Sequence, residues 1–106
     1  MSNYLTYSPN DISYAVSSTV STPAGLAAAK KILVLRFIPG SIPAAVRKVR
    51  VKNAAASVLN EWSVLTTVSE SVEIGSTVTT ATSAPGFKLD TDNADCSGVL
   101  VIRILS

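Results

Sequence analysis

The chain has 106 residues, which is the length of a single domain. Apolar residues make up 47%, charged residues only 15%, and the net charge is +2, whereas soluble domains usually carry roughly 25% charged residues. Histidine is absent and Cys96 is the single cysteine, which excludes a Ser-His-Asp or Cys-His catalytic site, a zinc site with imidazole ligands and a disulfide within the chain. We therefore predict one domain, residues 1–106, built around one apolar core.

The first residues carry no basic segment followed by an apolar stretch, so we expect no signal peptide and synthesis in the cytoplasm. The longest unbroken apolar runs, residues 32–35 and 99–102, are far shorter than the roughly 20 residues that span a bilayer. We expect no membrane partner. The single cysteine fits a reducing place of synthesis.

The composition favours strands over helices. Thirty of the 106 residues are Val, Ile or Thr, whose β-branched side chains pack well on a pleated sheet. Ala is frequent, but its clusters lack the i, i+3, i+4, i+7 apolar stripe of a helix. With turn residues at roughly ten-residue spacing, this predicts an all-β fold: a small antiparallel β-sandwich or barrel of jelly-roll or immunoglobulin-like size, with six to eight strands.

The opening segment, residues 1–25, is rich in Ser and Thr and holds all three tyrosines of the chain, Tyr4, Tyr7 and Tyr14. Two interpretations stay open. The segment forms one or two edge strands whose tyrosines are half-buried in its own domain, or it is an arm that packs on a neighbouring subunit with the tyrosines as anchors.

Two strongly apolar strands are predicted at residues 32–38 and 99–105. Both faces of the first are apolar apart from Arg36, which indicates a central strand with both faces covered. The second ends one residue before the chain does, so we expect it to be held inside a sheet. Its continuous apolar face predicts three core residues, Leu100, Ile102 and Ile104.

Three further strands are predicted at residues 57–69, 72–82 and 87–89. The connection at residues 69–71 has the length of a hairpin turn, which predicts that the first two of these strands pair with each other. Gly75 marks a bulge or a kink.

Residues 44–53 predict a strand with one charged face. Lys48, Arg50 and Lys52 point to the same side, because side chains alternate along a strand. Three cations in a row could follow a phosphate backbone, but the strand lacks the aromatic side chains on which bases stack. We favour a charged face that protects the sheet from wrong pairing.

Charge is unevenly distributed along the chain. Residues 1–53 carry seven basic and one acidic residue, and residues 54–106 carry two basic and six acidic residues. We favour the interpretation that basic and acidic strands are neighbours and form cross-strand ion pairs of well under about 1 kcal/mol each. The alternative is two patches of opposite sign that meet across a subunit interface.

The densest acidic cluster is residues 90–95, where three carboxylates and an amide could hold a hard cation such as Ca²⁺. The calcium-loop pattern fails, however, since Ala94, Asp95 and Val101 stand where an oxygen ligand, a glycine and a bidentate glutamate are needed. We favour a solvated loop held by Asx turns, with no metal. Cys96 has no histidine to activate it, and no glycine-rich phosphate loop is present, so we expect no enzyme and no cofactor.

Small size, sparse charge and abundant Ala, Ser, Thr and Val are typical of subunits of regular assemblies. By analogy these features favour a structural protein that is incorporated into a virion, such as a bacteriophage capsid decoration (cement) protein or a minor structural protein. The alternative is a nucleic-acid-binding or carbohydrate-binding β module.

We expect self-association, as a trimer or as a contact within a larger shell, and contacts with other capsid subunits, because sparse charge weakens repulsion between copies. One sandwich has a single interior, so outward-facing Leu33, Leu35 or Val99 need cover from a neighbouring subunit or from the opening segment. The interface candidates are Tyr4, Tyr7, Tyr14, Lys48, Arg50 and Lys52.

Overall fold

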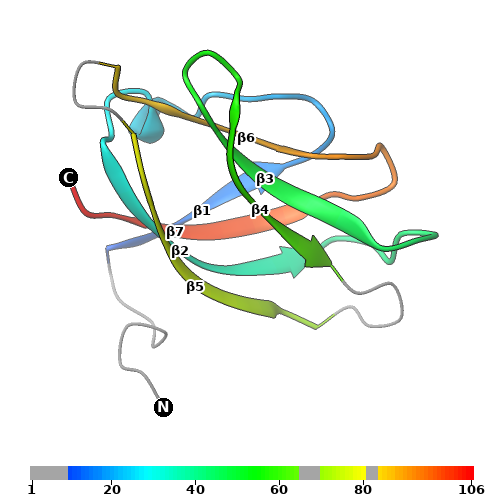
Figure 1. Ribbon diagram of the computed structural model, residues 1–106. Helices are drawn as coiled ribbons and strands as arrows, with labels where there is room; N and C mark the ends of the chain where they lie inside the picture. Colours follow the sequence, from blue (N-terminus) through cyan, green and yellow to red (C-terminus); the bar gives the residue numbers. More distant parts are fainter. Residues whose placement is uncertain (1–9, 65–69, 81–83) are drawn as a thin grey trace.

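The computed structural model describes residues 10–64, 70–80 and 84–106, and the predicted all-β fold is confirmed (Figure 1). In this part of the chain, no helix is long and apolar enough to cross a membrane. The elements in chain order are the strand β1 (Asp11–Val16), the short 3₁₀ turn η2 (Ala24–Leu26), and the strands β2 (Lys31–Pro39), β3 (Arg47–Asn53), β4 (Val58–Val64), β5 (Val72–Thr79), β6 (Phe87–Thr91) and β7 (Gly98–Ile104).

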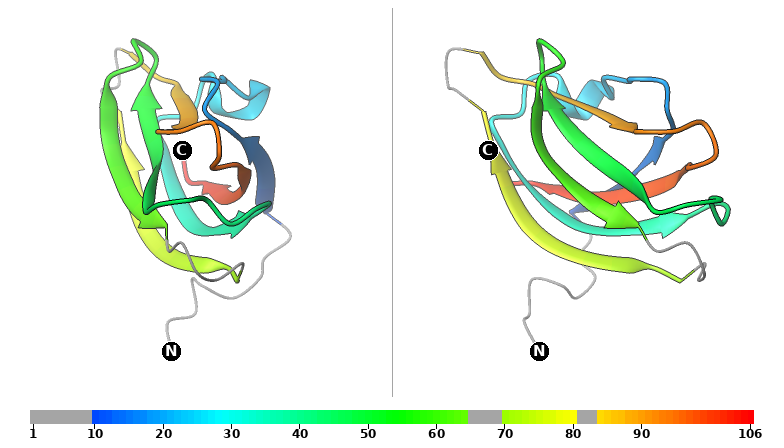
Figure 2. Two further views of the ribbon diagram at one scale, coloured as in Figure 1. Left: turned by 90° about the vertical axis from the view of Figure 1, so that its right-hand side faces the viewer. Right: turned by 45° about the vertical axis from the view of Figure 1, so that its right-hand side comes forward.

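The strands form two antiparallel sheets that pack face to face (Figures 1 and 2). The order is β1-β7-β2-β5 in the four-stranded sheet and β4-β3-β6 in the three-stranded sheet. After β1, the chain crosses to the three-stranded sheet, where Ser21 and Leu89 exchange backbone hydrogen bonds of 3.1 and 3.0 Å. The Thr91 N–H also donates to the Ser17 carbonyl, at 2.8 Å. The described part of the opening segment therefore forms an edge strand and closes one side of the sandwich.

The predicted hairpin between β4 and β5 is wrong. β4 pairs with β3, and β5 pairs with β2, so the two strands lie in different sheets. A short connection fits a hairpin but also fits a crossing between sheets. The pairing follows the faces that must be buried, here Val49 and Val51 on β3 and Ile32 and Val34 on β2.

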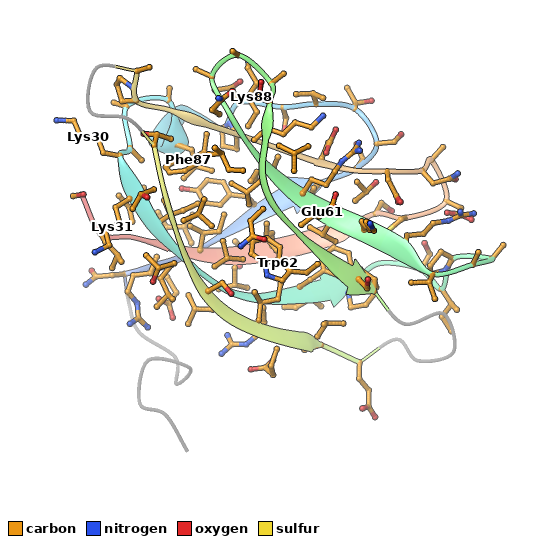
Figure 3. All side chains as sticks on the ribbon, in the orientation of Figure 1. Lys30, Lys31, Glu61, Trp62, Phe87 and Lys88 are labelled. Carbon is orange, nitrogen blue, oxygen red and sulfur yellow. The ribbon has the colours of Figure 1, made fainter. Side chains whose placement is uncertain are left out.

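The core lies between the sheets. Leu100 and Ile102 are fully buried, as predicted, whereas Ile104 near the end of β7 is only partly buried. Phe37 and Phe87 are the largest fully buried side chains, and Figure 3 labels Phe87 among the side chains of the interior.

Two irregularities shift the register of β2 with its two neighbours. Gly75 has a φ of 65° where the register between β2 and β5 shifts, which confirms the predicted bulge. Between β2 and β7, one extra residue at Leu35 stands between the pairs formed by Val34 and Arg36. The extra residue exchanges the two faces of the strand, so Val34 and Phe37 both enter the core.

A second apolar cluster lies apart from the main core. Leu33, Leu35 and Val101 are 7%, 0% and 6% exposed, and Val99 packs against them. They belong to the other face of the four-stranded sheet. Leu33 and Leu35 are thus already covered within the single chain, whereas Val99 is only partly buried. Of the two expected sources of cover, a neighbouring subunit is not needed for Leu33 and Leu35.

Candidate functional site

The basic strand β3 lies between two acidic neighbours. In the strand register, Arg50 is opposite Glu61 of β4 and Asp90 of β6. The Lys48 ammonium lies 3.0 Å from Glu61, and the Lys52 ammonium lies 2.7 Å from Asp90. The predicted cross-strand ion pairs are thus confirmed, and Lys48, Arg50 and Lys52 all have anions within the chain.

Asp90 is the best enclosed charge of this face, since its side chain is 2% exposed. Arg50 binds it through two hydrogen bonds of 2.8 and 3.0 Å, and Lys52 adds a third. Burial is the largest single effect and raises the pKa of Asp90, but the hydrogen bonds and the positive charges of Arg50 and Lys52 together outweigh it and hold the pKa below its ordinary value. The Asp90 hydrogen bond correspondingly raises the pKa of Arg50.

Sequence reasoning placed Asp90 in a polar loop, but β6 continues through Asp90 to Thr91. Thr91 stands opposite Val49 and is buried, and its hydroxyl donates to the Cys96 carbonyl at 2.7 Å. The β-branched Thr91, at the next alternate position after Phe87 and Leu89, was the available signal for the longer strand.

The other two carboxylates of residues 90–95 bind different partners. Asp92 accepts a hydrogen bond from the Lys48 backbone N–H at 2.9 Å. Asp95 accepts two hydrogen bonds from Arg47, of 2.8 and 2.9 Å, and one from the Ala44 N–H at 3.0 Å. These contacts hold the pKa of Asp95 below its ordinary value. The expected Asx turn is present, since the Asn93 side chain accepts from the Asp95 N–H, but the loop binds its neighbours and is not merely solvated.

In the described part of the chain, no three His, Cys, Asp or Glu side chains are grouped so as to hold a metal ion. Cys96 is buried, and burial, together with Asp92 and Asp95, raises the pKa of its thiol. A thiol in this state is a poor nucleophile.

Asp95 fixes the connection between β2 and β3, which we call the end loop (residues 40–46). The Gly40 N–H donates to the Ser97 carbonyl at 2.8 Å, and the Ser41 hydroxyl donates to the Asp95 carbonyl at 3.3 Å. Figure 2, left, shows the end loop crossing this end of the sandwich beside the β6–β7 connection. The strand predicted from residue 44 begins only at Arg47, because the Ala44 N–H is bound to Asp95.

The end loop is held firmly, yet it exposes apolar side chains. Ile42 and Val46 are 53% and 57% exposed, and Ile38 at its base is 41% exposed. Single exposed apolar residues are ordinary on protein surfaces. Three of them on one short, hydrogen-bonded segment form a candidate contact surface.

A hollow of about 490 Å³ lies at the same end of the molecule. Strand pairing places it beside the end loop, because Gly98 is opposite Pro39 and Val99 is opposite Ile38. Its lining residues are small, apolar or hydroxyl-bearing and none is charged: Ala15, Val16, Ser17, Thr19, Ser21, Ser97, Gly98 and Val99.

Of the three tyrosines, only Tyr14 lies in the part of the chain that the structure describes. Tyr4 and Tyr7 lie outside the described residues. Tyr14 lies on β1, packs partly buried against the core of its own chain, and has a buried hydroxyl without a hydrogen-bond partner in the described part. The hydroxyl is 2.9 Å from where a Cβ on Gly25 would stand, so a larger residue there would displace it. This position agrees with the edge-strand interpretation of Tyr14.

No protein-family model, no curated protein and no solved structure matches this chain.

Proposed function

We propose that the protein is a structural subunit of a larger assembly, specifically a small virion component such as a bacteriophage capsid decoration (cement) protein or minor structural protein. The observation that carries this proposal is the end loop, which exposes Ile42 and Val46 while Asp95 holds its backbone in place. The composition, with few charges and many small side chains, supports the same proposal.

A loop of this kind is suited to binding another protein. Its apolar side chains gain roughly 25 cal/mol for each Å² of apolar surface that a partner covers. Ordering a mobile loop normally opposes binding. Here Asp95, Arg47 and Ser97 already fix the backbone, so little ordering remains to oppose it.

The charged face is less suited to binding. Phosphate would have to compete with Asp90 for Arg50 and Lys52, and with Glu61 for Lys48. A nucleic-acid-binding module normally leaves such cations available for phosphate. The pairing supports protein assembly over the nucleic-acid alternative.

Gradient fractionation tests the proposal. We expect the protein to migrate with virus-sized particles from the cells that produce it, and Ile42→Asp to release it, because a carboxylate in an apolar interface is costly to desolvate. Val58→Asp is the matched control, since Val58 is 47% exposed and lies on β4, opposite Lys52 at the other end of β3. Wild-type protein that stays at the top of the gradient would contradict the proposal, and a salt-dependent nucleic-acid complex would favour the alternative.

A further inference from the structure

We propose that the end loop binds a second copy of this chain, with Ile42 and Val46 of each copy entering the hollow of the other. This inference rests on the proposed assembly role and names one contact within it. Its basis is a protruding apolar element and an apolar recess on the same molecule, each without an occupant among the described residues.

The sizes of the two features are compatible. The hollow measures about 490 Å³, and an apolar protein cavity of roughly 150 Å³ already accommodates a benzene-sized group. The side chains of Ile42 and Val46, both more than half exposed, are of that order. The volume of the hollow therefore exceeds that of either side chain.

The chemistry is also compatible. The hollow is lined by the small or apolar residues Ala15 and Val99 and by the hydroxyl-bearing residues Ser17 and Thr19. Ser21 also lines it, but the hydroxyl of Ser21 is buried. No charge has to be desolvated when apolar side chains enter it, so no unpaired ion opposes the contact.

The location favours a two-fold pair. The end loop and the hollow lie side by side, because β2 and β7 pair through Ile38–Val99 and Pro39–Gly98 at this end. In a two-fold interface, the same surface patch faces itself, so both loops and both hollows are used at once. A ring such as a trimer needs the two complementary features on different sides of the subunit.

The pair should be weak in dilute solution. One loop and one recess from each copy make a contact smaller than the roughly 800 Å² per partner of standard interfaces. Copies bound next to each other on a particle would meet at a much higher effective concentration. The contact can therefore matter on an assembly even if it is scarce in a dilute sample.

Sedimentation of the full chain over a wide concentration range tests the pair directly. We expect wild type to form dimers, and Ile42→Asp and Ala15→Arg each to weaken dimerisation at least tenfold, the first by placing a charge on the loop and the second by filling the hollow. Val58→Asp is the control, because it also places a carboxylate at an exposed apolar position, on β4 beside the far end of β3. Thermal unfolding of each variant verifies that it is folded.

A mixture of the two variants makes the test specific. Ile42→Asp retains an intact hollow and Ala15→Arg retains an intact loop, so the mixture restores one of the two contacts. We expect the mixture to dimerise more strongly than either variant alone. A monomeric wild type at every concentration, unchanged dimerisation of Ile42→Asp, or loss of dimers in Val58→Asp would each overturn the pair. If Ile42→Asp still migrates with particles while dimers are lost, the pair stands, and the proposed role of the end loop in holding the protein on the particle fails.

Discussion

The outward faces of the two sheets exclude water in opposite ways. On the four-stranded sheet, Leu33, Leu35 and Val101 form an apolar cluster. On the three-stranded sheet, Asp90 is just as inaccessible, at 1% exposure, but it is enclosed by the charged side chains of Arg50 and Lys52. The same degree of burial is thus reached with apolar side chains on one sheet and with ions on the other.

This difference predicts how the stability contributed by each face responds to mutation and to pH. Apolar burial contributes in proportion to the area covered and does not depend on protonation. A buried carboxylate contributes only while it is ionised and its cations are present, because the desolvation of each ion must be offset by the other. Mutations and changes of pH should therefore affect the stability contributions of the two faces differently, although both faces hold equally buried side chains.

The largest effect is expected at the apolar face. Leu35→Ala should lower the free energy of unfolding by about 2–5 kcal/mol, the range for removing a large buried side chain. Leu35 is fully buried and occupies the extra position of β2, where the strand exchanges its faces. Urea unfolding measures the loss. Val58→Ala, at a half-exposed position, should change it by less than about 0.5 kcal/mol, and an equally small loss at Leu35 would show that the second cluster is not well packed.

The second effect concerns the ionic face. Asp90→Asn keeps the size of the side chain but removes the charge that Arg50 and Lys52 share, and we expect a loss of about 1–3 kcal/mol. The control is Asp92→Asn, because Asp92 accepts a backbone hydrogen bond from Lys48 and its replacement keeps an oxygen that can do the same. Thermal melting compares the two variants. A variant at Asp90 as stable as the control would mean that the enclosed carboxylate contributes no net stability.

The sequence predicts the inner faces of this fold better than its outer faces. Alternation along β7 correctly placed Leu100 and Ile102 in the core, and a glycine inside a strand correctly marked the bulge at Gly75. These features depend on local geometry. The partners of β4 and β5 depend on which distant strands bury their faces, and a connection of hairpin length carries no such information.

The same limit applies to the candidate site. Charge segregation predicted that the basic strand has acidic neighbours, and this is correct. The sequence did not show that Asp95, about 50 residues away, binds the Ala44 N–H and thereby keeps residues 44–46 out of the strand. The sequence alone therefore predicts Val46 as a strand residue and does not predict its 57% exposure.

The third prediction uses pH to separate the two faces. The folded pKa of Asp90 is lowered, so its stabilisation is present above the unfolded pKa of about 3.9 and is lost as the pH falls from there through the folded pKa. Urea midpoints measured from pH 6 to pH 2 should fall less steeply for Asp90→Asn than for wild type. Leu35→Ala should follow the wild-type slope at a lower midpoint. Equal slopes for Asp90→Asn and wild type would show that Asp90 is not held ionised by the fold.

The smallest effect is expected where the ionic face meets water. Lys48 and Glu61 form a pair of 3.0 Å whose side chains are 49% and 39% exposed, and exposed pairs of this kind are worth about 0.2–1 kcal/mol. Glu61→Gln should therefore cost less than 1 kcal/mol, which is about 4–8 °C or less in melting temperature for a domain of this size. Because solvent ions screen exposed charges, the difference from wild type should shrink further in 1 M salt, whereas the loss in Asp90→Asn should persist. A larger loss of stability in Glu61→Gln than in Asp90→Asn would contradict this prediction. It would mean that the burial of an ion pair on this face does not determine how much the pair stabilises the fold.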